Sequence, residues 1–339
     1  MIKEVTEKLN NNILPDKTEI LEAFDEIYSG IADEVLAVSF ITLLNGFIKT
    51  ENNIDIIESA IKSANSAMKR ISLNLDLTYA VKTTEIEDNT KYFDISFIRD
   101  IVLASNNVPV VKYSIDYSKS SEYITKKLNI NPYQKNENGE FDTESIEKTN
   151  YCYIKPDETE SYLKYSDNIS KKLCFKNILN ITNKMLNPCM AKNIAIGVDN
   201  IDKVEKTAKL CLNLNYTNSI VISSKDNTPF VSPEQESYVA EAWKNKIFAY
   251  RLTPELVDLP LHPIKELECE NIDHNIETID ELFKGNLKNS AIYDTAVINS
   301  ALALYIVKKA DSVMNGIEMA KNAIDTGLAK EKFEAIKNK

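Results

Sequence analysis

The first part of the chain carries apolar side chains at helical spacing. In "DKTEILEAFDEIYSG" they share one face, at Ile20, Leu21, Phe24, Ile27 and Tyr28. Asp16 is placed to cap this helix and Gly30 to end it. The next stretch, 32–49, is apolar nearly all round, which predicts a buried helix that can also serve as a subunit contact. Residues 52–70 repeat the amphipathic pattern, so residues 1–71 are predicted to form a small helical domain.

From about residue 72 the helical spacing of apolar residues gives way to short β-branched runs that alternate with helical patterns. The short β-branched runs "VPVVKYS" (108–114) and "SIVISS" (219–224) are typical of buried parallel strands. Helical patterns lie between and after these runs, at 120–128, 203–214 and 294–308. This alternation predicts an α/β fold with a mostly parallel central sheet that is flanked by helices.

The composition is that of a soluble globular protein, with 43% hydrophobic and 27% charged residues among 339. The net charge is −11, and the only arginines are Arg70, Arg99 and Arg251. Because an acidic surface repels a phosphate backbone, we expect no nucleic-acid partner. No apolar run approaches the roughly 18–20 residues of a membrane span, and the polar first residues do not resemble a signal peptide.

The cysteines are scattered along the chain without the spacing of a metal site. They are Cys152, Cys174, Cys189, Cys211 and Cys269. An odd number of unclustered cysteines predicts free thiols in a reducing compartment. We therefore expect a cytoplasmic protein.

One loop at the start of the α/β pattern carries acidic residues and no glycine. In "TTEIEDNTKYFDIS" (83–96), Glu85, Glu87 and Asp88 stand where many α/β enzymes hold an anion on backbone N–H groups. Carboxylates repel an anion, and Cβ atoms block the close approach of the backbone to it. The loop therefore predicts a lost phosphate site.

Three longer stretches resemble the anthranilate phosphoribosyltransferase family (glycosyltransferase family 3), whose fold is shared with pyrimidine nucleoside phosphorylases. They are "LEAFDEIYSG…NSAMKR" (21–70), "KNILNITNKMLNPCMAKNIAIGV" (176–198) and "YDTAVINSALALYIVKKADSVMNGIEMAKNAIDTGLA" (293–329). The resemblance implies a helical domain of residues 1–71, joined by a helical segment near 170–187. It implies an α/β domain made of residues 72–169 and 188–339. It also implies a homodimer formed through the N-terminal helices.

The motif that holds pyrophosphate in this family is not kept. The family's Gly-Thr-Gly-Gly-Asp corresponds to residues 84–88, which contain no glycine. The string Thr-Phe-Asn-Ile-Ser-Thr that follows it corresponds to "YFDISF" (92–97), which keeps Ser96 and places Asp94 where the amide belongs. We therefore expect that phosphoribosyl pyrophosphate does not bind.

Three further parts of the family's site are replaced. The string Lys-His-Gly-Asn appears as "KYSI" (112–115), so only its lysine remains. The Asp-Glu pair that holds Mg²⁺ corresponds to Pro229 and Phe230, which cannot ligate a hard cation. The arginine that holds the anthranilate carboxylate corresponds to Ser170. These losses together predict that the phosphoribosyltransferase activity is lost. Phe230 is among the side chains that could fill an inter-domain cleft.

Several polar positions remain candidates for ligand binding in that cleft. They are Asp88, Asp94, Ser96, Lys112, Ser114 and Ser118. Each also has a structural explanation, as a solvated remnant, an acidic loop or a helix cap. His262 and His274 have no nucleophile pattern beside them and are predicted to be structural or exposed. We predict no catalytic residue, no metal site and no cofactor.

Two functions stay open at this point. The first is a catalytically inactive homologue, a pseudoenzyme that acts as a binding or interaction protein for a small molecule or a protein partner. The second is a glycosyl- or phosphoribosyl-type transferase whose pocket is rebuilt for a different, less anionic substrate. A deep pocket with convergent polar groups would favour the transferase, and a filled one would favour the pseudoenzyme.

Overall fold

The computed structural model describes residues 1–51, 53–73, 77–86, 91–113, 121–130, 143–154 and 161–337. The chain divides into two compact units. The first comprises Met1–Ile71, Tyr113–Asp116 and Lys155–Cys189, and the second comprises Ser72–Lys112, Tyr117–Ile154 and Met190–Lys339. Among the described residues, no helix is both long and apolar enough to cross a membrane.

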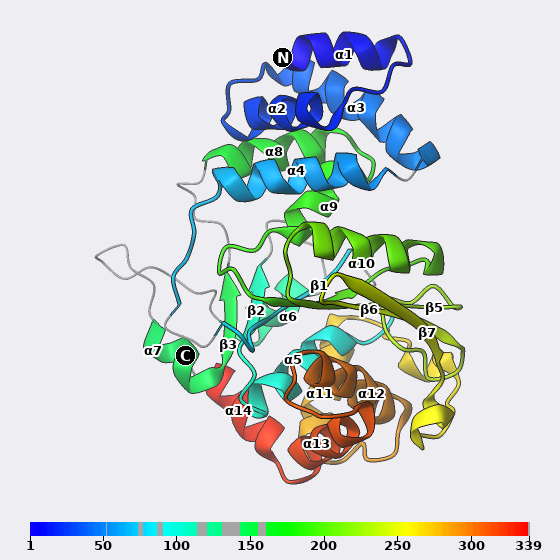
Figure 1. The fold of residues 1–339 in the computed structure, drawn as a ribbon. Coiled ribbons are helices and arrows are strands. Elements are labelled where there is room, and N and C mark those ends of the chain that lie inside the picture. Colours follow the sequence, from blue (N-terminus) through cyan, green and yellow to red (C-terminus); the bar gives the residue numbers. More distant parts are fainter. Residues whose placement is uncertain are drawn as a thin grey trace. The chain divides into compact units, whose positions relative to one another are not determined.

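The first unit is built from helices (Figure 1). They are α1 (Ile2–Asn10), α2 (Lys17–Tyr28), α3 (Glu34–Glu51), α4 (Ile54–Ala67), α8 (Ser161–Lys172) and α9 (Ile178–Met185). The predicted start of α2 is confirmed, because the Asp16 carboxylate accepts hydrogen bonds from the Thr18 and Glu19 N–H groups at 2.8 and 3.0 Å. Gly30 follows the helix at φ 72°, a conformation that favours glycine.

Helix α3 buries one side within its unit and exposes the other. Phe40, Ile41 and Leu44 are fully buried, whereas Val35 is 74% exposed. The predicted burial of this helix is therefore confirmed for one side, and the other side is open in a single chain. Its apolar surface exceeds what the other helices of the unit cover.

The second unit is organised around a seven-stranded sheet with the order β3-β2-β1-β4-β5-β6-β7. The strands are β1 (Val81–Glu85), β2 (Val110–Tyr113), β3 (Tyr151–Ile154), β4 (Asn193–Gly197), β5 (Asn218–Ser224), β6 (Ser237–Trp243) and β7 (Lys246–Leu252). β1 runs parallel to β2 and β4, and β4 runs parallel to β5. The predicted mostly parallel sheet is confirmed. The antiparallel additions β6 and β7 were not anticipated.

Helices cover the two faces of this sheet. They are α5 (Ile95–Ser105), α6 (Ser121–Lys127), α7 (Thr143–Thr149), α10 (Val204–Asn213), α11 (Ile272–Phe283), α12 (Ala291–Ile306), α13 (Val313–Asp325) and α14 (Leu328–Lys337). Short 3₁₀ turns lie at Ile201–Lys203, Pro254–Val257 and Ile264–Leu267. Figure 1 shows α10 on one face of the sheet and α5, α12 and α13 on the other.

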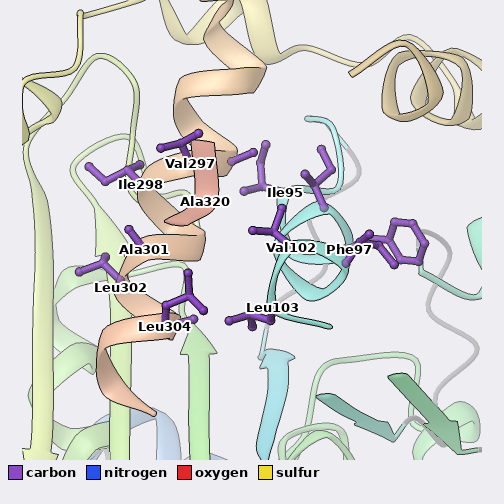
Figure 2. Packing of buried hydrophobic residues seen from close by; sticks show 14 of the residues in the cluster. Ile95, Phe97, Val102, Leu103, Val297, Ile298, Ala301, Leu302, Leu304 and Ala320 are labelled. Atoms are coloured by element: carbon purple, nitrogen blue, oxygen red, sulfur yellow. The ribbon is translucent and has the colours of Figure 1, made fainter. Parts of the chain in front are cut away.

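The core of the second unit lies where α5 meets α12 and α13. Side chains of α5, among them Val102 and Leu103, belong to one buried cluster with Val297 and Leu304 of α12 (Figure 2). Gly316 of α13 lies so close to α12 that an added Cβ would come within 2.6 Å of the Ala301 carbonyl oxygen. This packing fixes α5, whose N-terminus carries the candidate site.

Candidate functional site

Two of the predicted residues lie at the N-terminus of α5. Asp94 is the N-cap of the helix, and its Oδ1 accepts hydrogen bonds from the Phe97 N–H at 2.9 Å and the Ser96 hydroxyl at 2.7 Å. The Asp94 N–H in turn donates to Asn275 Oδ1 at 3.3 Å. Both Asp94 and Ser96 are buried. The carboxylate at this position therefore closes the helix N-terminus, where an anion could otherwise bind.

The lysine retained from the family motif forms a salt bridge and a hydrogen bond with side chains of its own unit. Lys112 lies in β2, one residue before its end. Its Nζ lies 3.1 Å from Asp100 Oδ2 and donates to Ser96 Oγ at 3.3 Å. Asp100 has no exposed surface, and its Oδ2 also accepts from the Thr83 hydroxyl at 2.9 Å. The other oxygen of Asp100 faces the Arg99 guanidinium at 3.4 Å. We call Asp94, Ser96, Arg99, Asp100 and Lys112 the ion cluster.

The ion cluster is balanced electrostatically. Burial lowers the pKa of Lys112, but the nearby carboxylates of Asp100, Asp94 and Glu85 outweigh it and raise the pKa above its ordinary value. Lys112 is therefore protonated at neutral pH, as Arg99 always is. Each cation has a carboxylate of the same cluster beside it, so the lysine charge is compensated before any ligand arrives.

Sequence reasoning found part of this cluster. Asp94, Ser96 and Lys112 were predicted as remnant ligand positions, and the structure brings all three together. Asp100 and its neighbour Arg99 were missed. Their signal was present, because two charged residues interrupt the otherwise apolar "ISFIRDIVLAS" of α5. The predicted positions Asp88, Ser114 and Ser118 lie outside the described residues.

The positions that correspond to the family's metal ligands hold apolar side chains packed in the unit. Phe230 is 4% exposed, belongs to the core, and meets the Tyr92 ring edge-on with centroids 6.1 Å apart. The Val231 N–H donates to Asn299 Oδ1 at 3.0 Å, which fixes the backbone after Phe230. The carbonyl of Pro229 lies against Gly197, where an added Cβ would be only 2.1 Å away.

Asp226 carries the carboxylate nearest in sequence before Pro229 and Phe230, and both of its oxygens already accept hydrogen bonds from nearby hydroxyl groups. Asp226 Oδ2 accepts from the Ser232 hydroxyl at 2.6 Å, and its Oδ1 is bonded to Ser224 and Thr228. These bonds close the turn that follows β5. Within the described part of the chain, no group of three or more His, Cys, Asp or Glu side chains is placed to hold a metal ion.

Ser170 stands at the position of the family's substrate arginine, and its hydroxyl already has hydrogen-bond partners. Ser170 is buried in the first unit and accepts hydrogen bonds from the side-chain amides of Asn180 at 2.9 Å and Asn177 at 3.4 Å. Asn177 and Asn180 also form the capping box at the start of α9. Ser170 therefore supports the helix junction.

The histidines have protein partners. His262 Nε2 lies 2.7 Å from Asp294 Oδ2, and the ring of His274 meets Phe93 edge-on at 5.1 Å. All five cysteines are free, as predicted. Burial raises the pKa of Cys211 to about 12, so this thiol is inert at neutral pH.

Comparisons with known proteins agree on one relationship. Residues 87–330 match the family model described as "Glycosyl transferase family, a/b domain". The chain is 30% identical over 342 residues to a protein of Acetivibrio thermocellus named anthranilate phosphoribosyltransferase, covering 98% of this chain and 95% of the relative. It is 27% identical over 329 residues to the protein of that name from Buchnera aphidicola, covering 96% and 93%.

Solved structures with the same name share the fold. The crystal structure from Thermus thermophilus superimposes with a TM-score of 0.84 at 17% identity and covers 98% of both chains. A structure from Saccharomyces cerevisiae, described as a complex with PRPP and Mg, also has a TM-score of 0.84, at 18% identity, and covers 99% of this chain and 97% of its own.

Proposed function

The chain belongs to the anthranilate phosphoribosyltransferase family of glycosyl transferases, and from that premise we propose that it is a member that has lost phosphoribosyl transfer and retains the scaffold for binding or interaction. The observation that carries this proposal is the contact between Lys112 and Asp100. The one cationic side chain kept from the family motifs is neutralised by a carboxylate of its own unit. An arriving phosphate would have to displace a buried partner.

The electrostatic argument extends to the whole N-terminus of α5. A carboxylate about 4 Å from a phosphate charge costs about 1–4 kcal/mol per pair at surface dielectrics. Asp94 and Asp100 both lie within the ion cluster, and Glu85 ends the adjacent strand β1. Mg²⁺ could offset such repulsion, but Pro229 and Phe230 offer it no side-chain oxygen. The added carboxylates and the loss of the metal ligands therefore both weaken the binding of a phosphate group at this site.

The test is calorimetry with phosphoribosyl pyrophosphate and Mg²⁺. We expect no binding heat and no phosphoribosyl transfer to anthranilate, with the relative from Acetivibrio thermocellus as the positive control. Affinity in the micromolar range, or transfer above background, would overturn the proposal. If phosphoribosyl pyrophosphate fails to bind but a less anionic glycosyl donor is turned over, the alternative of a rebuilt transferase pocket is favoured instead.

We also propose that the chain forms a homodimer through its N-terminal helices. Val35, Ser39 and Thr42 lie along the outer side of α3 at helical spacing. The hydroxyls of Ser39 and Thr42 donate to carbonyls of α3 itself at 2.8 and 2.7 Å, so they need no solvent partner. With Ile31 exposed just before the helix, this stripe offers apolar surface that a second copy can cover.

A charge on this stripe should separate the subunits without unfolding them. Val35→Asp is expected to remove the contact through α3, so light scattering should show a smaller assembly than the unmodified protein forms at the same concentration, with the thermal midpoint of each unit retained. Leu44→Asp should instead unfold the first unit, because Leu44 is fully buried within the chain. Leu256→Asp, at an exposed apolar position of the second unit, is the matched control. A monomer at tens of micromolar in the unmodified protein would contradict the proposal.

A further inference from the structure

The strand β7 forms one edge of the sheet (Figure 1). It pairs with β6 through seven consecutive residue pairs, from Ser237↔Leu252 to Trp243↔Lys246, without a bulge or a proline. Within the described residues, no other strand pairs with β7. Most of its side chains are open to solvent, and Phe248 is 46% exposed. A long, regular edge of this kind is a template for another strand.

The hairpin geometry determines which backbone groups point outward. Lys244 and Asn245 form a two-residue turn with φ values of 48° and 59°, the type I′ pattern that leaves the flanking residues as a hydrogen-bonded pair. Hydrogen-bonded and non-hydrogen-bonded pairs then alternate along the ladder. Every second residue of β7, counted from Lys246, therefore directs its backbone groups toward β6. The residues between them, Ile247, Ala249 and Arg251, direct their N–H and C=O groups to the open edge.

We infer that this edge pairs with β7 of a second copy of the chain, antiparallel and centred on Ala249. The three outward-facing residues are symmetric about Ala249, so a two-fold axis there satisfies all of them at once. Ala249 would face its own counterpart, and Ile247 would face Arg251 of the other copy. Each of these three pairs would be a hydrogen-bonded pair.

The side chains are compatible with this register. Phe248 would lie opposite the second copy's Tyr250 on both sides of the axis, a favourable aromatic cross-strand pair. The two cations of the strand, Lys246 and Arg251, would face Leu252 and Ile247, so like charges are never directly opposite. Arg251 also has its own carboxylate, since its Nη1 lies 3.5 Å from Glu236 Oε1. Ala249 is small and exposed, which leaves room at the axis.

Amide hydrogen exchange resolved to single residues tests this pairing. The amides of Ile247, Ala249 and Arg251 are expected to exchange about tenfold more slowly when the concentration of the full chain is raised about 100-fold, because pairing protects them. The amides of Phe248 and Tyr250 bond to β6 and should not respond to concentration. If the outer amides exchange rapidly at every concentration, the inference is overturned. It is also overturned if they are protected at the lowest concentration and Ala249→Lys does not remove that protection.

Substitutions at the axis give an independent readout. Ala249→Lys places two like charges opposite each other, so the exchange rates of the outer β7 amides should no longer depend on protein concentration. Leu256→Lys adds the same charge at an exposed position outside the strand and should leave it intact. Ala249→Pro is a second variant, because it removes only an outward-facing N–H and proline is tolerated on edge strands. If both Ala249 variants retain the concentration-dependent protection, β7 does not pair in this way. Val35→Asp acts on α3, so the two interfaces are tested separately.

Discussion

Asp100→Ala is expected to lower the free energy of unfolding by about 3–5 kcal/mol, because it leaves two buried cations without their shared carboxylate. Lys112 and Arg99 both face Asp100, and all three side chains are buried. Chemical denaturation followed by circular dichroism measures the change. Glu205→Ala, which removes an exposed carboxylate from α10, is the matched control and should shift stability by less than about 0.5 kcal/mol.

Replacing the ion pair as a unit should be milder than breaking it. The double variant Asp100→Leu with Lys112→Met substitutes apolar side chains for both charges, and we expect it to be more stable than Asp100→Ala by at least about 1 kcal/mol. If Asp100→Ala costs no more than Glu205→Ala, Lys112 is not held by the cluster. Its charge would then be available to a ligand, and the main support for a lost phosphate site would fail.

Restoring the family's residues in two loops is expected to give no enzyme. The variant combines Thr84→Gly, Ile86→Gly, Glu87→Gly, Pro229→Asp and Phe230→Glu. Residues of a catalytic site act as a unit, so loss of one can cost as much as loss of all, on the order of 10⁶ in rate. The ion cluster, Tyr113 and Ser170 remain unchanged in this variant. Phosphoribosyl transfer to anthranilate should therefore stay at the background level.

The same variant should also be less stable than the parent chain. Phe230→Glu alone places a carboxylate in the core beside Tyr92, which costs several kcal/mol or forces the segment outward. Phe230→Leu is the control that keeps an apolar side chain there and should retain most of the stability. Measurable turnover by the five-residue variant would show that inactivity rests on the two loops alone, and the ion cluster would then have no part in it.

The pattern of neighbouring residues was sufficient to predict many of the helices and strands of this protein. The spacing of apolar residues located α2 and α4, and the chemistry of Asp16 and Gly30 marked the two ends of α2, because capping and helix termination depend on a few adjacent residues. The β-branched runs located β2 and β5 for the same reason. The loss of glycine between Thr84 and Asp88 is also visible in the sequence alone, since it concerns which residue types are present.

Only the tertiary structure decided what the remaining polar groups do. The sequence favours a solvated remnant at Lys112 over an anion ligand, and only the packing of α5 places Asp100 3.1 Å from it. Whether Phe230 is exposed or buried depends on α12 and on Tyr92, which are far away in the sequence. Val35 and Ala249 read as ordinary apolar positions, and only packing shows that they lie on open surfaces. Burial and charge pairing arise from contacts between distant segments, and a pattern of neighbouring residues does not contain them.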